Sequence, residues 1–321
     1  MLLLLLLACL PKYEPGVAWG PHHEPLPPAL TEVFANQSHD VVFDEAVARR
    51  KAGDTRGAIE RLAWLERQQP GDFAVLYQLG LAYEGAADFE SALTVYDRMA
   101  ADDPDGTYVL DWGFRRAMCL EELDRYEEAL AEYRSLPKTT DPRKAAVLEL
   151  ATQIAALRTG RGSLGAVERA IAAAAELEDT QWMQAKGHIA IAVKLLESAE
   201  DLDFDVGQRK QVRHLRQRAA LIVEAEGNIA TTVRLEQVEW ILRGMLVLGD
   251  AYAAMAEDLL RSRPPRGVDP DAYQEALQET ARVIRAKAYT AYDQGLIVAG
   301  KFSVESRVTE ALAARRDSLD L

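Results

Sequence analysis

Apolar positions between residues 73 and 104 recur at helical spacing in two consecutive blocks. They are Leu76, Leu79, Gly80 and Tyr83 in the first block, and Ala92, Tyr96 and Met99 in the second. Each set lies on one face of a predicted helix. Gly80 and Ala92 are small, as residues must be where two helices cross closely. The pattern predicts a helix–turn–helix unit that ends at Pro104.

The same unit recurs along the chain. Ala58 precedes Ala92 by 34 residues, and Ala129 follows Ala92 by 37. Three units are predicted, at 39–70, 73–104 and 108–142, followed by a degenerate fourth pair at 143–178. In length and in the placing of small and large residues they resemble tetratricopeptide (TPR) repeats. The resemblance implies an all-α, right-handed helical solenoid.

Long helices are predicted in the C-terminal region, 179–321. Their expected spans are 180–200, 208–226, 229–262, 271–298 and 304–318, with a break at Gly227-Asn228. The alanine and tyrosine spacing of about the last ninety residues is similar to the ends of TPR proteins of bacterial gliding-motility envelope complexes. The TPR lipoprotein of the outer-membrane β-barrel assembly machine is a second family that this chain resembles, through its plan of a lipobox followed by TPR repeats. The long helices predicted at the end of this chain do not fit that family.

The N-terminus is apolar but too short to span a membrane, since about twenty apolar residues are needed. Leu6, Leu7, Ala8 and Cys9 resemble the lipobox of bacterial lipoproteins. That resemblance implies a signal peptide over 1–9, lipidation of Cys9 and, because Leu10 is not aspartate, a place on the outer membrane facing the periplasm. Residues 10–38 are rich in proline and predict an extended tether. The usual basic segment is missing, so a cytosolic protein with an apolar N-terminus is the alternative.

Composition narrows the classes of partner. The chain is 49% hydrophobic and 27% charged, and its net charge is −14. A polyanion would be repelled, so nucleic acid is not an expected partner. Two cysteines do not imply a disulfide framework.

The inner face of the repeats carries the main predicted site. Superposing the three units gives an aromatic row beside an aliphatic row: Phe43, Tyr77 and Phe114, and Val47, Leu81 and Met118. An apolar trough of this kind predicts a peptide or helix of a partner protein. TPR proteins that grip a terminal carboxylate use Lys and Asn at inner positions, which these rows lack. The alternative is that Leu30–Phe34 or a C-terminal helix covers the trough.

A second possible site is basic. Arg209, Arg213 and Arg216 share one face of a predicted helix that also carries Lys210, His214 and Arg218. This patch could meet an acidic partner or anionic lipid; the alternative is a solvated face paired with neighbouring acidic helices.

No catalytic, metal-binding or phosphate-binding motif is visible. Cys119 is expected to be buried, and His188 and His214 to be surface or packing residues. The sequence therefore predicts a non-enzymatic interaction scaffold without cofactor or small-molecule substrate, in a bacterial envelope complex of gliding motility or envelope assembly. The alternatives are a cytosolic TPR adaptor, and an envelope enzyme or glycan-binding protein with a site in the C-terminal helices.

Overall fold

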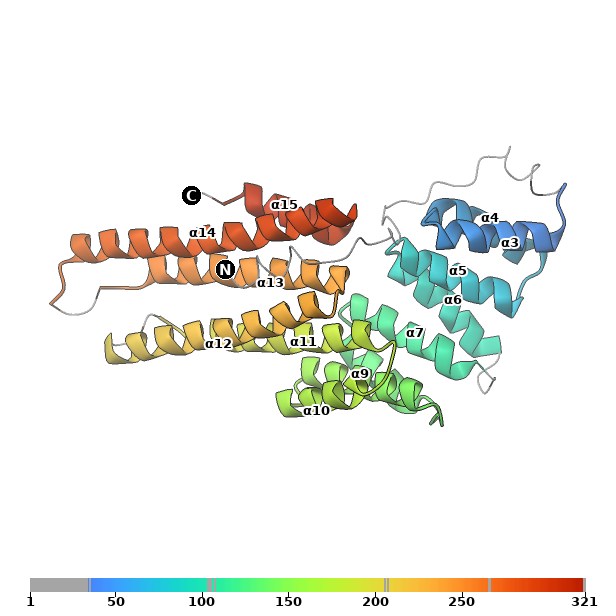
Figure 1. The fold of residues 1–321 in the computed structure, drawn as a ribbon, viewed down its shortest axis with the longest axis horizontal. Helices are drawn as coiled ribbons and strands as arrows, with labels where there is room; N and C mark the ends of the chain where they lie inside the picture. Colours follow the sequence, from blue (N-terminus) through green and yellow to red (C-terminus); the bar gives the residue numbers. More distant parts are fainter. Residues whose placement is uncertain are drawn as a thin grey trace. The chain divides into compact units, whose positions relative to one another are not determined.

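The computed structural model describes residues 34, 36–102, 106, 108–204, 206, 208–264 and 267–319. These residues form thirteen α-helices and no strand (Figure 1). The predicted all-α class is confirmed. The chain divides into two compact units, which are described separately below.

The first unit stacks its helices in chain order. It consists of α3 (His39–Lys51), α4 (Thr55–Gln68), α5 (Phe73–Gly85), α6 (Phe89–Asp102), α7 (Val109–Glu122), α8 (Tyr126–Ser135) and α9 (Pro142–Arg158). Each helix packs on the next one along the chain, so three helix pairs follow one another as a solenoid (Figure 1). The three pairs fall within the ranges 39–70, 73–104 and 108–142, and Pro104 lies outside the described residues.

Aspartates fix where several of these helices begin. The Asp54 carboxylate accepts a hydrogen bond of 2.8 Å from the backbone N–H of Gly57, and Asp72 accepts one of 2.9 Å from Ala74. Such caps satisfy backbone donors that have no partner within the helix. The turn between α7 and α8 contains Asp124 with a φ of 57°, a left-handed conformation typical of helix C-termini.

Close approach within the repeats explains the small residues. A Cβ added to Gly80 of α5 would lie 2.6 Å from Cζ of Tyr96 on α6, and one added to Gly113 of α7 would meet Leu136. The expected crossing at Gly80 is confirmed, and the bulky residue that fills it is Tyr96. Real Cβ atoms do not tolerate such distances, so a side chain at Gly80 would push the two helices apart.

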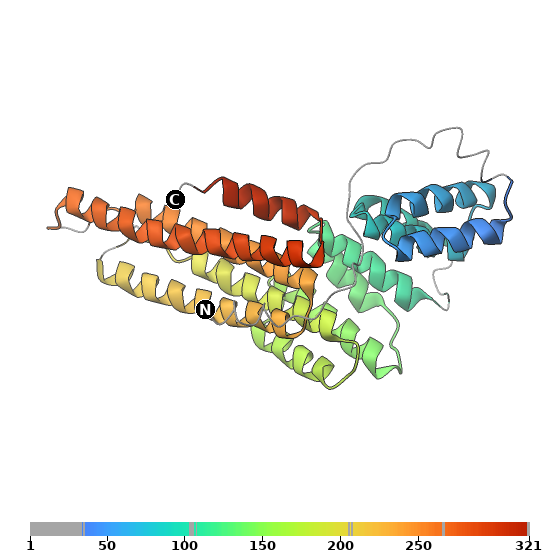
Figure 2. The same ribbon diagram turned by 45° about the horizontal axis from the view of Figure 1, so that its top comes forward.

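The second unit is built from longer helices. They are α10 (Leu164–Ala175), α11 (Gln181–Glu200), α12 (Gln208–Arg234), α13 (Val238–Arg261), α14 (Pro270–Phe302) and α15 (Arg307–Asp317). α13 is central, because it packs against α11, α12, α14 and α15. α13 and α14 run side by side along most of their length (Figure 2). At Gly244 and Gly249 of α13 an added Cβ would overlap Ile229 of α12 and Tyr292 of α14, respectively.

The predicted break at Gly227-Asn228 is wrong. α12 continues to Arg234, and the chain turns at 235–237, where Glu236 has a φ of 59°. Gly227 is exposed and costs the helix only about 1 kcal/mol relative to alanine, whereas Ile229 and Val233 continue the buried face. Burial outweighs the local propensity, and the expected helix over 229–262 is the end of α12 followed by α13.

The predicted fourth pair corresponds to α9 and α10, which fall in different units. Among the described residues, no helix is both long enough and apolar enough to cross a membrane.

Candidate functional site

The predicted inner-face residues lie on the first helix of each repeat. α3 carries Phe43 and Val47, α5 carries Tyr77 and Leu81, and α7 carries Phe114 and Met118. All six side chains are half-buried. Their helix neighbours Ala46, Leu76, Leu79, Ala117 and Leu120 are buried in the core of the solenoid. The inner rows are therefore apolar positions that packing among the described residues covers only in part.

Phe114 also takes part in packing within its own repeat. Its ring centroid lies 5.4 Å from that of Tyr133 on α8. Phe114 is therefore both a member of the predicted aromatic row and a packing residue between α7 and α8.

Polar side chains from four helices surround Tyr77. Arg50 of α3 donates to Oε1 of Gln78 at 3.0 Å. The other contacts, Arg115 to Glu84 at 2.9 Å and Lys144 to Asp111 at 2.7 Å, are ion pairs that join α7 to α5 and α9 to α7. The Tyr77 phenol is close enough to affect the pKa of Arg50, Arg115 and Lys144.

These three cations differ in how far their charge is compensated. Burial lowers the pKa of Arg50, and the nearby charge of Arg115 lowers it further. The hydrogen bond that Lys144 donates to Asp111 raises the pKa of Lys144. Burial opposes the charge of Arg115, but the Glu84 carboxylate and nearby tyrosines raise the pKa of Arg115 overall. Arg50 has a neutral partner in Gln78 and no carboxylate partner among the described residues. The guanidinium of Arg50 is thus the position where an anionic group would be most stabilised.

Phe34 is the described part of the segment that was expected to cover the trough. It is 1% exposed, and its ring packs against Trp64 at 5.8 Å and under the guanidinium of Arg61 at 5.0 Å. Both partners belong to α4, the second helix of the first repeat. Leu30 and the residues up to 33 lie outside the described residues.

Two buried tyrosine–carboxylate hydrogen bonds join the helices of the second and third repeats. Tyr96 donates to Glu84, and Tyr133 donates to Oε2 of Glu121 at 2.8 Å. Burial and the adjacent carboxylate raise the pKa of each tyrosine. Each carboxylate precedes its tyrosine by twelve residues, so the pair recurs in the register of the repeats, although it was not predicted from the sequence.

Side chains with chemical reactivity are buried or engaged. Cys119 is 1% exposed, and burial raises the pKa of its thiol, as expected for an inert packing residue. Burial lowers the pKa of His188, whose Nδ1 lies 2.9 Å from Oδ1 of Asn228. Within the described ranges, no three His, Cys, Asp or Glu side chains are placed to hold a metal ion.

The predicted basic patch lies on the first turns of α12, in the second unit. Arg209, Arg213 and Arg216 are exposed. Arg218, which the sequence analysis grouped with them, is instead 1% exposed; it pairs with Asp258 at 2.7 Å and stacks over Phe204. Its place half a turn around the helix from Arg209 explains the difference.

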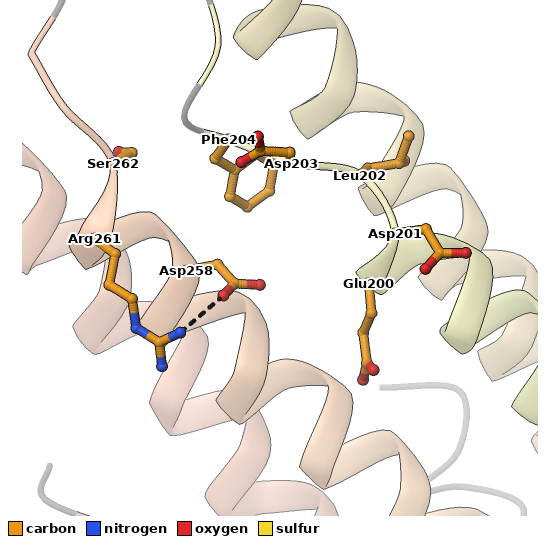
Figure 3. Close-up of a pocket in the computed structure, with 8 residues that line it drawn as sticks. All are labelled: Glu200, Asp201, Leu202, Asp203, Phe204, Asp258, Arg261 and Ser262. Atoms are coloured by element: carbon orange, nitrogen blue, oxygen red, sulfur yellow. Dashed lines mark ion pairs between the residues drawn. The ribbon is translucent and has the colours of Figure 1, made fainter.

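A pocket of about 360 Å³ opens at one end of the second unit (Figure 3). Its walls come from the end of α11 with the following loop and from the end of α13: Glu200, Asp201, Leu202, Asp203, Phe204, Asp258, Arg261 and Ser262. Asp258 is held by Arg218 and by Arg261, and Ser262 lies 3.0 Å from the hydroxyl of Tyr273. These contacts close the end of the helix bundle, and the acidic wall residues Glu200, Asp201 and Asp203 take no part in them.

Comparison with known proteins supports the repeat assignment. Residues 74–106 match the model of the tetratricopeptide repeat family. A crystal structure of a tetratricopeptide repeat protein from Parabacteroides merdae ATCC 43184 is 16% identical, with a TM-score of 0.42 over 87% of this chain and 99% of that chain. No curated protein matches this sequence. The predicted presence of TPR repeats is confirmed. Such repeats typically mediate protein–protein interactions.

Proposed function

We propose that this protein is a non-enzymatic scaffold whose first unit binds a segment of a partner protein on the inner face of α3, α5 and α7. The observation that carries the proposal is the row of half-buried apolar side chains, Val47, Tyr77 and Leu81, beside the incompletely compensated Arg50. Stacked repeats hold such a face in place before binding, so the receptor loses little entropy when a peptide or helix docks.

The chemistry of this face suggests what the partner segment carries. Aromatic or aliphatic side chains would contact Tyr77 and Leu81. A carboxylate on the same segment would meet the guanidinium of Arg50, whose pKa is lowered by burial and by the charge of Arg115, with Glu84 opposing both. The preferred ligand is therefore an apolar segment with one acidic group.

Selection of peptides on the full chain tests this proposal. Peptides displayed from a random library are selected on the immobilised protein, and their affinities are measured by fluorescence anisotropy. Tyr77→Ala combined with Leu81→Ala should weaken the selected peptides at least tenfold, because a few central apolar contacts carry most of such an affinity. Arg50→Glu should shift the selection from acidic peptides to basic ones.

The matched control is Val41→Ala. Val41 also lies on α3, its apolar side chain is 47% exposed, and it does not belong to the two inner rows. It should leave the peptide affinities unchanged. Circular dichroism should show equal helicity for all variants. Selected peptides that bind the Tyr77→Ala, Leu81→Ala variant within twofold of the unaltered protein would contradict the proposal.

We further propose that Cys9 is lipidated and anchors the scaffold to the outer membrane on its periplasmic side, within an envelope complex. The support is the Leu6-Leu7-Ala8-Cys9 motif and the proline-rich stretch after it, all outside the described residues. Labelled palmitate should be incorporated in a lipoprotein-processing bacterium and lost in Cys9→Ser. If the unaltered protein takes up no label and is recovered in the soluble fraction, the cytosolic adaptor is favoured instead. Assignment to gliding motility or envelope assembly stays a prediction from the sequence.

A further inference from the structure

Four cations on the first turns of α12 form a basic stripe, defined as Arg209, Lys210, Arg213 and Arg216. All four side chains are exposed. None of them forms an ion pair with a carboxylate in the part of the chain that the structure describes. Cations elsewhere in the same unit do find such partners: Arg243 pairs with Glu239 at 2.9 Å and Arg282 with Glu279 at 2.7 Å.

The position of the basic stripe makes its lack of partners costly. The N-terminal end of a helix carries a partial positive charge and stabilises acidic residues, whereas the described first turn of α12 contains none. Arg209 and Lys210 lie in this first turn, where they oppose the partial charge of the helix end, and the four cations of the stripe repel one another. An external anionic surface would relieve this repulsion.

Uncompensated negative charge lies at the C-terminal end of α11. Glu200 and Asp201 define this acidic end; both are exposed, and neither forms an ion pair with a described residue (Figure 3). Partial burial raises the pKa of the Glu200 carboxyl; Asp258, Glu197 and Asp250 add to the rise, and Arg218 opposes it. The negative potential at this end therefore exceeds what neighbouring cations neutralise.

The two surfaces are neighbours on one unit. Residues 201–207 connect α11 to α12, and α11 packs against α12. Nδ1 of His214 donates to the backbone oxygen of Asp203 at 2.7 Å, which ties the loop to the side of α12. A two-fold axis passing between adjacent basic and acidic surfaces brings each surface of one molecule onto its opposite in another.

We propose that a second copy of this chain binds at this end of the second unit, with the basic stripe of each copy facing the acidic end of the other. The contact is isologous: Arg213 and Arg216 of one copy meet Glu200 and Asp201 of its partner, and the reverse pairing follows from the symmetry. Val212 on α12, 45% exposed, adds an apolar contact beside the charges. Since the surfaces are solvent-exposed, the association depends on salt.

Sedimentation velocity of the full chain across protein concentration and ionic strength tests the proposal. A species of twice the mass of one chain should form at low salt and dissociate at about 0.5 M NaCl, where screening acts over only a few ångströms. Arg213→Glu combined with Arg216→Glu should abolish it, as should Glu200→Lys combined with Asp201→Lys. Mixing these two variants should restore a heterodimer, because the reversed charges complement each other at one of the two contacts.

The control is Arg169→Glu combined with Arg282→Glu, which changes the net charge of the same unit equally on α10 and α14. This variant should dimerise like the unaltered chain. A monomer at every concentration would overturn the proposal, as would a dimer that survives both charge reversals, for example one formed through the apolar N-terminus. Failure of the mixed variants to associate would also overturn it. None of these outcomes involves the inner face of the first unit.

Discussion

Removal of the Tyr133 hydroxyl is the perturbation that best isolates a single interaction in the repeats. Tyr133 and Glu121 are 2% and 5% exposed, and the hydroxyl donates to the carboxylate at 2.8 Å. Tyr133→Phe keeps the ring, its packing against Phe114 and the helix. The variant changes only the buried hydrogen bond between α8 and α7.

The structure sets the size of the expected effect. A hydrogen bond to a charged group contributes about 1.5–3 kcal/mol, and its loss leaves a carboxylate oxygen buried without that donor. We expect Tyr133→Phe to lower the free energy of unfolding by about 2 kcal/mol. Tyr96→Phe should cost about 1 kcal/mol, because Glu84 retains its ion pair with Arg115.

Thermal unfolding followed by circular dichroism measures the change. For a unit of this size, 2 kcal/mol corresponds to a melting temperature lower by roughly 6–10 °C. Hydrogen exchange by mass spectrometry localises the effect, and faster exchange is expected in α7 and α8 but not in the second unit.

Tyr108→Phe serves as the control, since Tyr108 is 56% exposed and has no hydroxyl partner among the described residues. A loss for Tyr133→Phe within about 0.5 kcal/mol of this control would refute the assigned role of the buried pair. Glu121→Gln in the Tyr133→Phe background should recover part of the stability, because it removes the buried charge.

Three further predictions concern the second unit. In urea unfolding, Gly249→Ala should destabilise this unit by about 1–3 kcal/mol, because the new methyl group would overlap the Tyr292 ring. Gly227→Ala, in open space on α12, should instead stabilise it by up to about 1 kcal/mol. Equal effects of the two substitutions would contradict the packing described for Gly249. Glu236→Gly should stabilise the chain by about 1 kcal/mol, since glycine adopts the φ of 59° without strain; no change in the urea midpoint would count against it. Burial lowers the folded-state pKa of His188, so the unfolded chain binds more protons and the free energy of unfolding should fall as the pH drops below about 6.5. His188→Gln should remove this dependence of stability on pH. If the dependence persists in the variant, it belongs to other groups.

Local patterns in the sequence were sufficient to predict which face of each repeat helix is buried. Leu76, Gly80 and Ala92 recur at the helical period because each packs within one pair, so their spacing reports their burial. The turn at Glu236 was missed because the alternative break at Gly227 has the stronger local signal. Only contacts between distant segments, such as Gly244 against Ile189, decide between the two.

The candidate site remains a prediction from the sequence. The register of the repeats predicts that Tyr77 and Leu81 lie on the inner face, and the structure shows that both are half-buried. The polar surroundings of Tyr77 were not predictable, because Arg50 and Lys144 come from helices whose lateral packing no spacing in the sequence encodes.

The tyrosine–carboxylate hydrogen bonds recur in both units. In the second unit Tyr252 donates to Glu226 and Tyr292 to Asp250, each at 2.7 Å, and the pKa of both phenols is raised by burial and by the carboxylate. Phenols held in this way do not ionise in moderate alkali while their helices remain packed. The part of the phenolate absorbance at high pH that comes from these four carboxylate-bonded tyrosines should therefore appear only as each unit opens. Both halves of the chain thus contain an intrinsic optical reporter, which would allow their unfolding to be followed without a label.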